Sequence, residues 1–196
     1  MPRAAYLDCF AGISGDMLLG ALLDAGWPLE RLQATVDALG IPGITVEAQR
    51  VSKHGLSATH ITIDAPGAQP LRHPADLYAI IEGAGLPEPV CERARAVIAA
   101  LAEAEARVHG IPVEEVHFHE VGAVDTLVDV TGAAAGLHEL GVERLTCSPL
   151  PWSHGSINIA HGAYPVPPPA VAELVQGLPV RGVDVAGETV TPTGAA

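Results

Sequence analysis

Glycine and proline divide this chain into short segments whose patterns alternate between strand and helix, and this alternation limits the fold more than any other feature. The first segment predicts a strand over Ala4–Phe10, a glycine-containing loop over 11–15 and a helix over Asp16–Asp24. The helix is expected to end at Gly26, because glycine commonly follows the last helical turn. Such a succession of single strands and single helices is typical of proteins that contain both in one fold.

The rest of the chain continues in the same way, and a hairpin is expected where two alternating patterns flank Lys53-His54-Gly55. Helices are predicted over Leu29–Leu39, Ala75–Glu82, Val90–Val108, Val124–Leu140 and Val171–Val175. Strands are predicted over Ile44–Val51, Ala58–Ile63, Val116–His119, Leu145–Cys147, Ser156–Ile159, Val180–Val185 and Thr189–Ala196. We therefore expect an α/β fold with a mixed sheet flanked by helices, with α+β as the alternative.

Composition excludes several classes of function. The 196 residues carry a formal net charge of −13, so nucleic acid is not expected as a partner. No apolar run approaches the roughly 18 residues of a membrane span, and no membrane association is expected. Cys9, Cys91 and Cys147 are odd in number and lack a C-x-x-C spacing, which predicts reduced thiols in the cytoplasm, used as small core residues. Because only 4% of the residues are aromatic, the core should consist of Ala, Val, Leu and Ile.

The loop between the first strand and the first helix is a candidate anion site. A helix N-terminus presents free backbone N–H groups, and Ser14 is placed to cap them. Asp8 and Asp16 flank the loop and could hold a metal ion bound to a phosphate. The spacing of the glycines matches neither the Walker loop nor G-x-G-x-x-G. The alternative is an ordinary tight turn capped by Ser14.

Two histidines predict a metal site in the second half of the chain. His117 and His119 would point to the same side of a strand, with Phe118 toward the core. Glu120 follows as a third ligand or as an orienting group. Imidazole suits Ni, Zn, Cu or Fe better than Mg or Ca. The alternative is an exposed edge strand that happens to bear two histidines.

The following helix repeats small and acidic residues on one stripe. Asp125 and Asp129 are four residues apart, and Gly132 and Gly136 continue the same face. Neighbouring like charges and interior glycines both cost stability, about 1 kcal/mol for each glycine. We interpret the stripe as one that faces a site, against the alternative of acids near the helix start and glycines for tight packing.

Two further loops contain polar groups with no specific pattern. His154-Gly155 and His161-Gly162 flank a predicted strand, and glycine next to histidine allows a backbone to approach a ligand. Thr191-Pro192-Thr193-Gly194 offers hydroxyl and N–H groups for a phosphate or a carboxylate. Alone, each is a turn.

Together these motifs resemble one family. Residues 6–17, YLDCFAGISGDM, resemble the opening of the nickel insertion proteins of nickel-pincer cofactor biosynthesis, the LarC family. Residues 117–125, HFHEVGAVD, resemble its central motif, which runs on through Asp129. Later matches are Ser148–Pro151, His161-Gly162, Pro165–Pro167 and Glu188–Ala196, and Lys53 and Gly55 fall at a Lys-x-Gly turn of the family. The family's histidine-rich tract is reduced here to residues 69–73 with His73 alone, so nickel storage there is not expected.

The resemblance implies a CTP-dependent nickel chelatase of the lyase class, which inserts Ni²⁺ into pyridinium-3,5-bisthiocarboxylic acid mononucleotide to make the cofactor of lactate racemase. It also implies that residues 1–196 are the N-terminal domain, inactive alone, and that CTP with Mg or Mn binds in a C-terminal half, a partner of this domain. A homo-oligomer is a further expectation. The alternatives are a non-catalytic docking or binding module and a metal-dependent phosphohydrolase.

The residues of the matching motifs receive expected roles. Catalytic roles are expected for Asp8, Asp16, Glu120 and Asp125. Cofactor binding is expected for Gly12, Ser14, Gly15, Lys53, Thr191 and Thr193. Nickel ligands are expected at His117, His119, Asp129 and His161.

Overall fold

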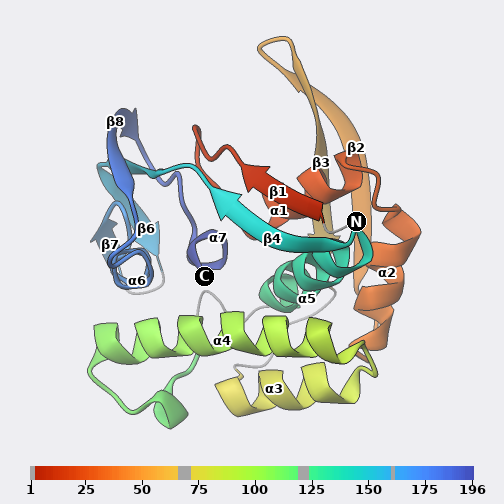
Figure 1. Cartoon of the computed structure of the whole chain (residues 1–196). Helices are drawn as coiled ribbons and strands as arrows, with labels where there is room; N and C mark the ends of the chain where they lie inside the picture. The colour runs from red at the N-terminus through yellow and green to blue at the C-terminus, as the bar shows by residue number, and fades with distance from the viewer. Residues whose placement is uncertain (1–2, 66–71, 119–123, 160–161) are drawn as a thin grey trace.

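The computed structural model describes residues 3–65, 72–118, 124–159 and 162–196 (Figure 1). The α-helices are α1 (Gly15–Asp24), α2 (Leu29–Ala38), α3 (Pro74–Gly83), α4 (Glu88–His109), α5 (Val124–Glu139), α6 (Pro169–Leu174) and α7 (Pro192–Ala195), with a short 3₁₀ turn η1 (Val113–Glu115). The strands are β1 (Arg3–Leu7), β2 (Thr45–Lys53), β3 (Leu56–Asp64), β4 (Val142–Cys147), β5 (Leu150–His154), β6 (Ser156–Ile159), β7 (Gly162–Pro165) and β8 (Val180–Ala186).

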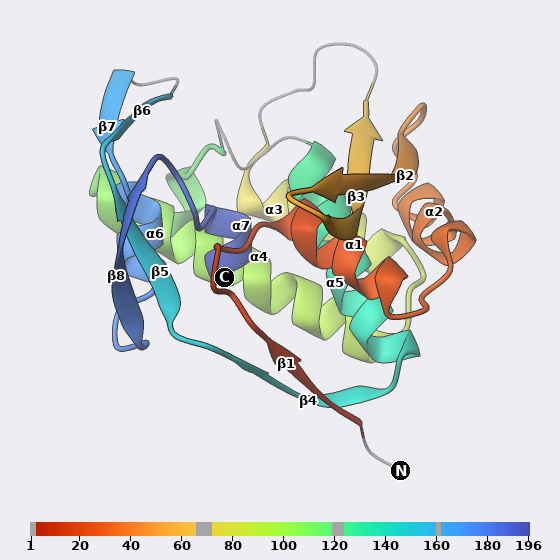
Figure 2. The same ribbon diagram turned by 90° about the horizontal axis from the view of Figure 1, so that it is seen from above.

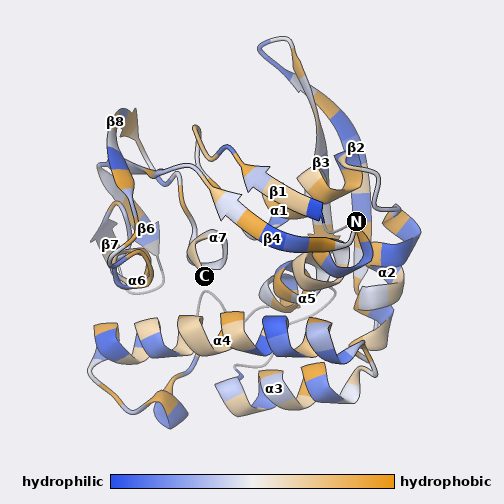
Figure 3. Cartoon of the chain, viewed as in Figure 1, coloured by the Kyte–Doolittle hydropathy of each residue, from blue (hydrophilic) through white to orange (hydrophobic). Residues whose placement is uncertain are grey.

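The main hydrophobic core lies among the first five helices and the β2–β3 hairpin. Leu19, Leu32, Ile98 and Leu127 are fully buried in it. Figure 1 shows α4 between α3 and α5, and Figure 3 shows the alternation of hydrophobic and hydrophilic residues that such a position requires of α4. The prediction of an aliphatic core is confirmed by these side chains.

The α/β prediction is confirmed, and parallel and antiparallel pairing both occur. In the described residues the strands form four two-stranded sheets, so the pairing is divided rather than continuous. β1 pairs with β4 and β5 with β8 in parallel, whereas the β2–β3 and β6–β7 hairpins are antiparallel. Figure 2, seen from above, shows β4 leading into β5, so the two parallel ribbons follow one another along the chain.

A smaller hydrophobic cluster joins the two ends of the described chain. Cys9 follows β1, Leu150 begins β5, Val171 and Val175 lie at α6, and Val190 precedes α7. All five side chains are buried. The cluster therefore holds the segment after β1 against the segment before α7.

Three local predictions were wrong. Residues 116–118 are not a strand, because they have no pairing partner among the described residues, although Phe118 is buried as expected. The segment 189–196 is not a strand either, since Pro192 and the Thr191 cap start the helix α7. Cys147 is exposed, so it is not a core residue, whereas Cys9 and Cys91 are buried.

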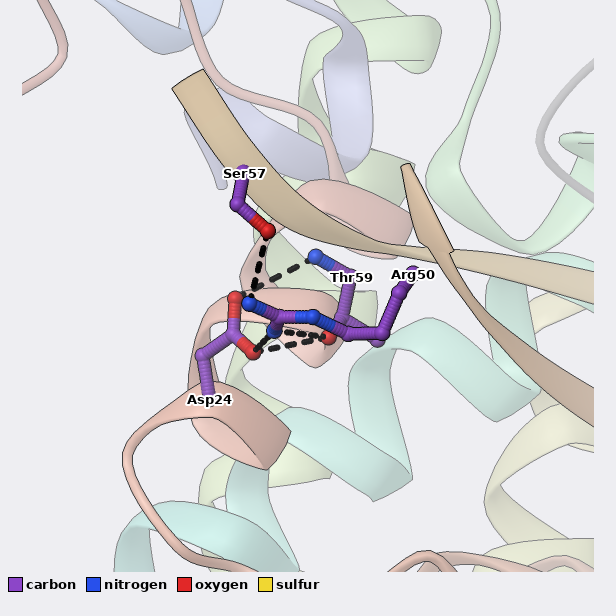
Figure 4. A network of polar contacts seen from close by, with 4 residues as sticks. All are labelled: Asp24, Arg50, Ser57 and Thr59. Atoms are coloured by element: carbon purple, nitrogen blue, oxygen red, sulfur yellow. Dashed lines mark hydrogen bonds and ion pairs between the residues drawn. The ribbon is translucent and has the colours of Figure 1, made fainter. Parts of the chain in front are cut away.

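A polar network fixes the hairpin on α1 (Figure 4). The Asp24 carboxylate accepts hydrogen bonds from the Thr59 hydroxyl at 2.7 Å and the Thr59 N–H at 3.2 Å, and it forms an ion pair with Arg50. Four residues earlier, a Cβ on Gly20 would lie 2.3 Å from the Thr59 carbonyl oxygen. The absence of a side chain at Gly20 lets helix and strand approach closely, which sets the position of the residues after Thr59.

Candidate functional site

A cavity of about 530 Å³ lies where several elements begin or end. Its walls come from the first turns of α1, α5, α6 and α7, from residues 60–63 of β3 and from the last turn of α4. The start of a helix carries unpaired N–H groups and a positive partial charge. Of the helices that begin at the cavity, α1 and α5 are the longest. The cavity is therefore suited to hold anionic groups of a ligand.

The loop before α1 is joined to the segment before α7. The Ile13 N–H donates to the Thr189 carbonyl at 3.0 Å, and the Thr191 N–H donates to the Ile13 carbonyl at 3.1 Å. A Cβ on Gly12 would lie 1.8 Å from the Thr189 oxygen, and one on Gly194 would lie 2.3 Å from the Ile13 oxygen. The first and last motifs of the chain thus form one wall of the cavity, 180 residues apart in sequence.

Five carboxylates line this cavity among the described residues, and three of them were selected from the sequence, whereas Glu105 and Glu188 were not. Asp16 comes from α1, and Asp125 and Asp129 come from α5. Burial, followed by the charges of Asp16 and Asp125, raises the pKa of Asp129 to about 8. Among the described residues its Oδ1 has no hydrogen-bond partner. A buried carboxylate with an unpartnered oxygen is placed to hold a proton or a cation.

Gly15 explains why Asp129 lies so deep. A Cβ on Gly15 would be 2.2 Å from Asp129 Oδ2, so only glycine leaves room for the carboxylate at the first turn of α1. Ser14 occupies the N-cap position, but its hydroxyl donates to Asp16 Oδ1 and accepts no hydrogen bond from the helix backbone. The prediction of a capping hydroxyl is therefore wrong in its partner, and Ser14 orients a cavity carboxylate.

Hydroxyl groups line the side of the cavity near α7. Thr191 caps α7 by accepting a hydrogen bond from the Gly194 N–H at 3.2 Å, and its hydroxyl shares another with Thr193 at 3.1 Å. Thr126 from α5 and Ser14 also line the cavity. These groups give the cavity a neutral hydrogen-bonding side beside the acidic one.

Histidines from three elements reach the cavity. His117, selected from the sequence, lines it and is exposed. His60 of β3 and His109 of α4 also line it but were missed, since each was an isolated histidine within a regular pattern. Glu105 lies one turn before His109 with Oε2 3.3 Å from Nε2, a spacing that the sequence could have indicated. In the described ranges, no three His, Cys, Asp or Glu side chains are grouped closely enough to hold a metal ion by themselves.

Other predicted residues lie elsewhere. Asp8 and Lys53 are exposed and are not part of the cavity wall, with Lys53 at the end of β2. His154 contacts Asp184 at 3.1 Å on the surface, away from the cavity. His119, Glu120 and His161 lie outside the described residues.

The glycines of α5 do not face a ligand. A Cβ on Gly132 would be 2.8 Å from side-chain atoms of Leu19 and Leu32, and one on Gly136 would be 2.9 Å from Leu22 and Trp27. The interpretation of the entire stripe as a site was therefore wrong. Only its two aspartates reach the cavity, and the glycines allow α1 and α2 to pack closely on α5.

The cavity thus brings carboxylates, histidines and hydroxyl groups together, a combination suited to a polar ligand that carries anionic groups or a cation. The family model described as nickel insertion protein matches residues 5–196, so the chain belongs to the nickel insertion protein family.

Individual relatives agree with this assignment. A protein of Staphylococcus epidermidis, named pyridinium-3,5-bisthiocarboxylic acid mononucleotide nickel insertion protein, is 44% identical over 196 residues, which cover 100% of this chain and 50% of that protein. A relative from Geotalea daltonii, also assigned by name to nickel insertion, is 48% identical over 99% of this chain and 50% of its own length. The chain thus spans about half the length of these relatives. No solved structure gives a significant match. Within the described ranges, no helix combines the length and apolar character needed to cross a bilayer.

Proposed function

We propose that this chain is the substrate-holding and nickel-positioning part of an enzyme that inserts Ni²⁺ into pyridinium-3,5-bisthiocarboxylic acid mononucleotide. The observation that carries the proposal is the convergence of Asp16, Asp125, Asp129 and His117 on one cavity whose other side is lined by hydroxyl groups. The name of the Staphylococcus relative supplies the substrate. The product would serve as the cofactor of lactate racemase.

The cavity offers different groups to different parts of such a substrate. Ser14, Thr191 and Thr193, together with the N–H groups at the start of α1, would bind the phosphate. The acidic side would face Ni²⁺ and the positively charged pyridinium ring, which favour nearby carboxylates. His117 would be a nickel ligand, because imidazole suits nickel.

The reaction requires a base. Two Ni–S bonds and one Ni–C bond form, the ring C–H bond breaks, and its electron pair becomes the Ni–C bond while nickel stays Ni²⁺. The released proton would pass to a cavity carboxylate, either Asp16 or Asp125, each of which lines the same space as His117. CTP with Mg or Mn would bind the other half of the enzyme, and its breakdown would drive insertion, a chelatase reaction of the lyase class.

The test measures product formation with the second half supplied. The chain would be combined with the remaining half of a relative, and the nickel-pincer nucleotide would be followed by its absorbance and mass with Ni²⁺, CTP and the dithiocarboxylate substrate. Asp125→Asn is expected to lower the rate about tenfold or more, because a neutral amide cannot accept the proton. The matched control is Asp37→Asn, an exposed aspartate of α2 outside the cavity.

Two outcomes would contradict the proposal. Unchanged product formation in an Asp16→Asn, Asp125→Asn double variant would show that the cavity carboxylates do not take part in the reaction. CTP breakdown by this chain alone would show that the nucleotide site lies here, and it would favour the phosphohydrolase alternative.

A further inference from the structure

Two imidazole rings from distant parts of the chain lie against each other at the edge of the cavity. His73, directly before α3, and His117, after η1, have ring centroids 4.0 Å apart with planes inclined by 46°. His117 lines the cavity, whereas His73 was not selected as a site residue from the sequence. The pair therefore adds a second imidazole beside the one already assigned to nickel.

One backbone hydrogen bond joins the two segments, and another hydrogen bond fixes the His73 backbone within its own segment. The Phe118 N–H donates to the Arg72 carbonyl at 3.4 Å, and the His73 N–H donates to Asp76 Oδ2 at 2.8 Å. Phe118 is buried, so the chain on either side of His117 is anchored in the core. The approach of the two rings follows from these anchors and does not depend on the rings alone.

One contact of the His73 ring favours a particular tautomer. The ring Nδ1 lies 3.1 Å from the Val116 carbonyl oxygen, and because a carbonyl only accepts, this contact is a hydrogen bond when Nδ1 carries the hydrogen. In the neutral ring the lone pair then belongs to Nε2. Histidines that bind metals through one nitrogen usually donate the other N–H to a carbonyl or carboxylate, which fixes the ring and raises its basicity.

We propose that His73, through Nε2, and His117 together receive Ni²⁺ at the edge of the cavity before it is inserted into the substrate. This inference rests on the proposed function and adds a ligand to it. Metal–nitrogen bonds of about 2.1 Å place two nitrogens on one ion about 3–4 Å apart, a separation comparable with the 4.0 Å between the two ring centroids. Two protein ligands leave the remaining positions to water and then to the thiocarboxylates, as an ion that must be handed over requires.

The test separates a ligand from a stacking partner. NiCl₂ would be titrated calorimetrically into the full 196-residue chain and into His73→Asn, whose amide N–H can still donate to the Val116 carbonyl but offers no imidazole nitrogen. Nickel affinity is expected to fall about tenfold or more in His73→Asn and in His117→Ala. His138→Asn, which changes an exposed histidine near the end of α5, is the matched control and should bind as the unchanged chain does.

X-ray absorption on the nickel-loaded protein gives a second measurement that does not depend on activity. The number of imidazoles on nickel is expected to be two and to fall to one in His73→Asn. Unchanged affinity and unchanged imidazole number in that variant would overturn this inference while product formation, measured separately, could still support the proposed function. A chain that binds no nickel would overturn both the pair and the metal-holding role.

Discussion

Gly15 and Asp129 are in direct contact at the first turn of α1, where a Cβ on Gly15 would lie 2.2 Å from the Asp129 carboxylate oxygen Oδ2. The contact joins the loop after β1 to α5 and positions a cavity carboxylate whose pKa burial raises. Both residues belong to motifs that resemble the nickel insertion proteins, and the structure gives a steric reason for the glycine of the first.

Gly15→Ala tests this contact. The added methyl group must displace the Asp129 side chain or α1, and overpacking of this kind costs about 1–3 kcal/mol. We expect the free energy of unfolding, measured in urea, to fall by that amount. Gly83→Ala, at the last residue of α3 with nothing within 4 Å of the new Cβ, should be neutral or slightly stabilising. Equal effects of the two changes would refute the steric account.

The raised pKa of Asp129 predicts how stability changes with pH. With a pKa near 3.8 in the unfolded chain and near 8 in the folded chain, Asp129 takes up a proton on folding between these two pH values. Its contribution to stability is therefore highest below about pH 4 and falls as pH rises toward 8. In Asp129→Asn this loss disappears. Relative to the variant, the parent chain should lose about 2 kcal/mol between pH 5 and pH 8, a fraction of the full shift because the side chain is half-buried.

The measurement is urea unfolding of both chains at pH 5, 6, 7 and 8, in a buffer with a chelator so that no metal ion binds the carboxylates. Parallel pH profiles of the two chains would contradict the prediction.

The close packing of α5 predicts a purely structural effect of Gly136→Ala. Its Cβ would lie 2.9 Å from the Trp27 ring, which is buried and held by a hydrogen bond from Nε1 to Glu139. We expect a loss of about 1–3 kcal/mol in the free energy of unfolding, although alanine is the better helix former. Nickel affinity should stay the same, and a changed affinity with unchanged stability would restore the interpretation of this glycine as a site residue.

The glycines of α5 also show which features the sequence could predict and which it could not. The helix was predicted over Val124–Leu140 and is observed over Val124–Glu139, because an apolar periodicity and a terminal glycine are local signals. Whether a glycine on it faces a ligand or another helix depends on neighbours that are distant in sequence. The prediction of a strand over residues 116–118 was wrong for the same reason, because an alternating pattern cannot show whether a partner strand exists.

The residues of the candidate site also fall into two groups, those that local motifs predicted and those that only tertiary packing places there. The motifs supplied Ser14, Asp16, His117, Asp125, Asp129, Thr191 and Thr193, which all line the cavity. His60 and His109, which line the cavity, and His73, which lies against His117, could not be assigned from local pattern, because only the packing of β3, α4 and α3 places them there.

The Asp24 network predicts an acid-sensitive contribution to stability. Hydrogen bonds from Thr59, and then the charge of Arg50, hold the pKa of Asp24 below its usual value. A lowered pKa stabilises the fold above the unfolded value near 3.8 and is lost as pH falls through the folded value. Asp24→Ala should cost about 0.5–1 kcal/mol at pH 7, a modest amount because the group is partly exposed, and a smaller amount at pH 2.5. Urea unfolding at both pH values measures this, and an equal cost at both would indicate lost packing instead.

The contact between the first and last motifs predicts that alanine substitution at Gly12 destabilises the fold more than alanine substitution at Gly187, although the two glycines have similar φ angles. Gly12 has φ +117° and its Cβ would meet the Thr189 carbonyl oxygen at 1.8 Å, whereas Gly187 has φ +101° and open space around it. Gly187→Ala should lower the free energy of unfolding by about 1 kcal/mol, because its only cost is the left-handed backbone conformation. At Gly12 the same change must also break the contact between the two motifs, so we expect an additional loss of at least about 1–2 kcal/mol in urea unfolding. Gly12→Ala should also weaken phosphate-ester binding measured by calorimetry with nicotinic acid mononucleotide, because the Ser14 and Thr191 sides of the cavity would separate. If both variants unfold at the same urea concentration and bind the nucleotide equally, the two motifs do not form a shared wall in solution.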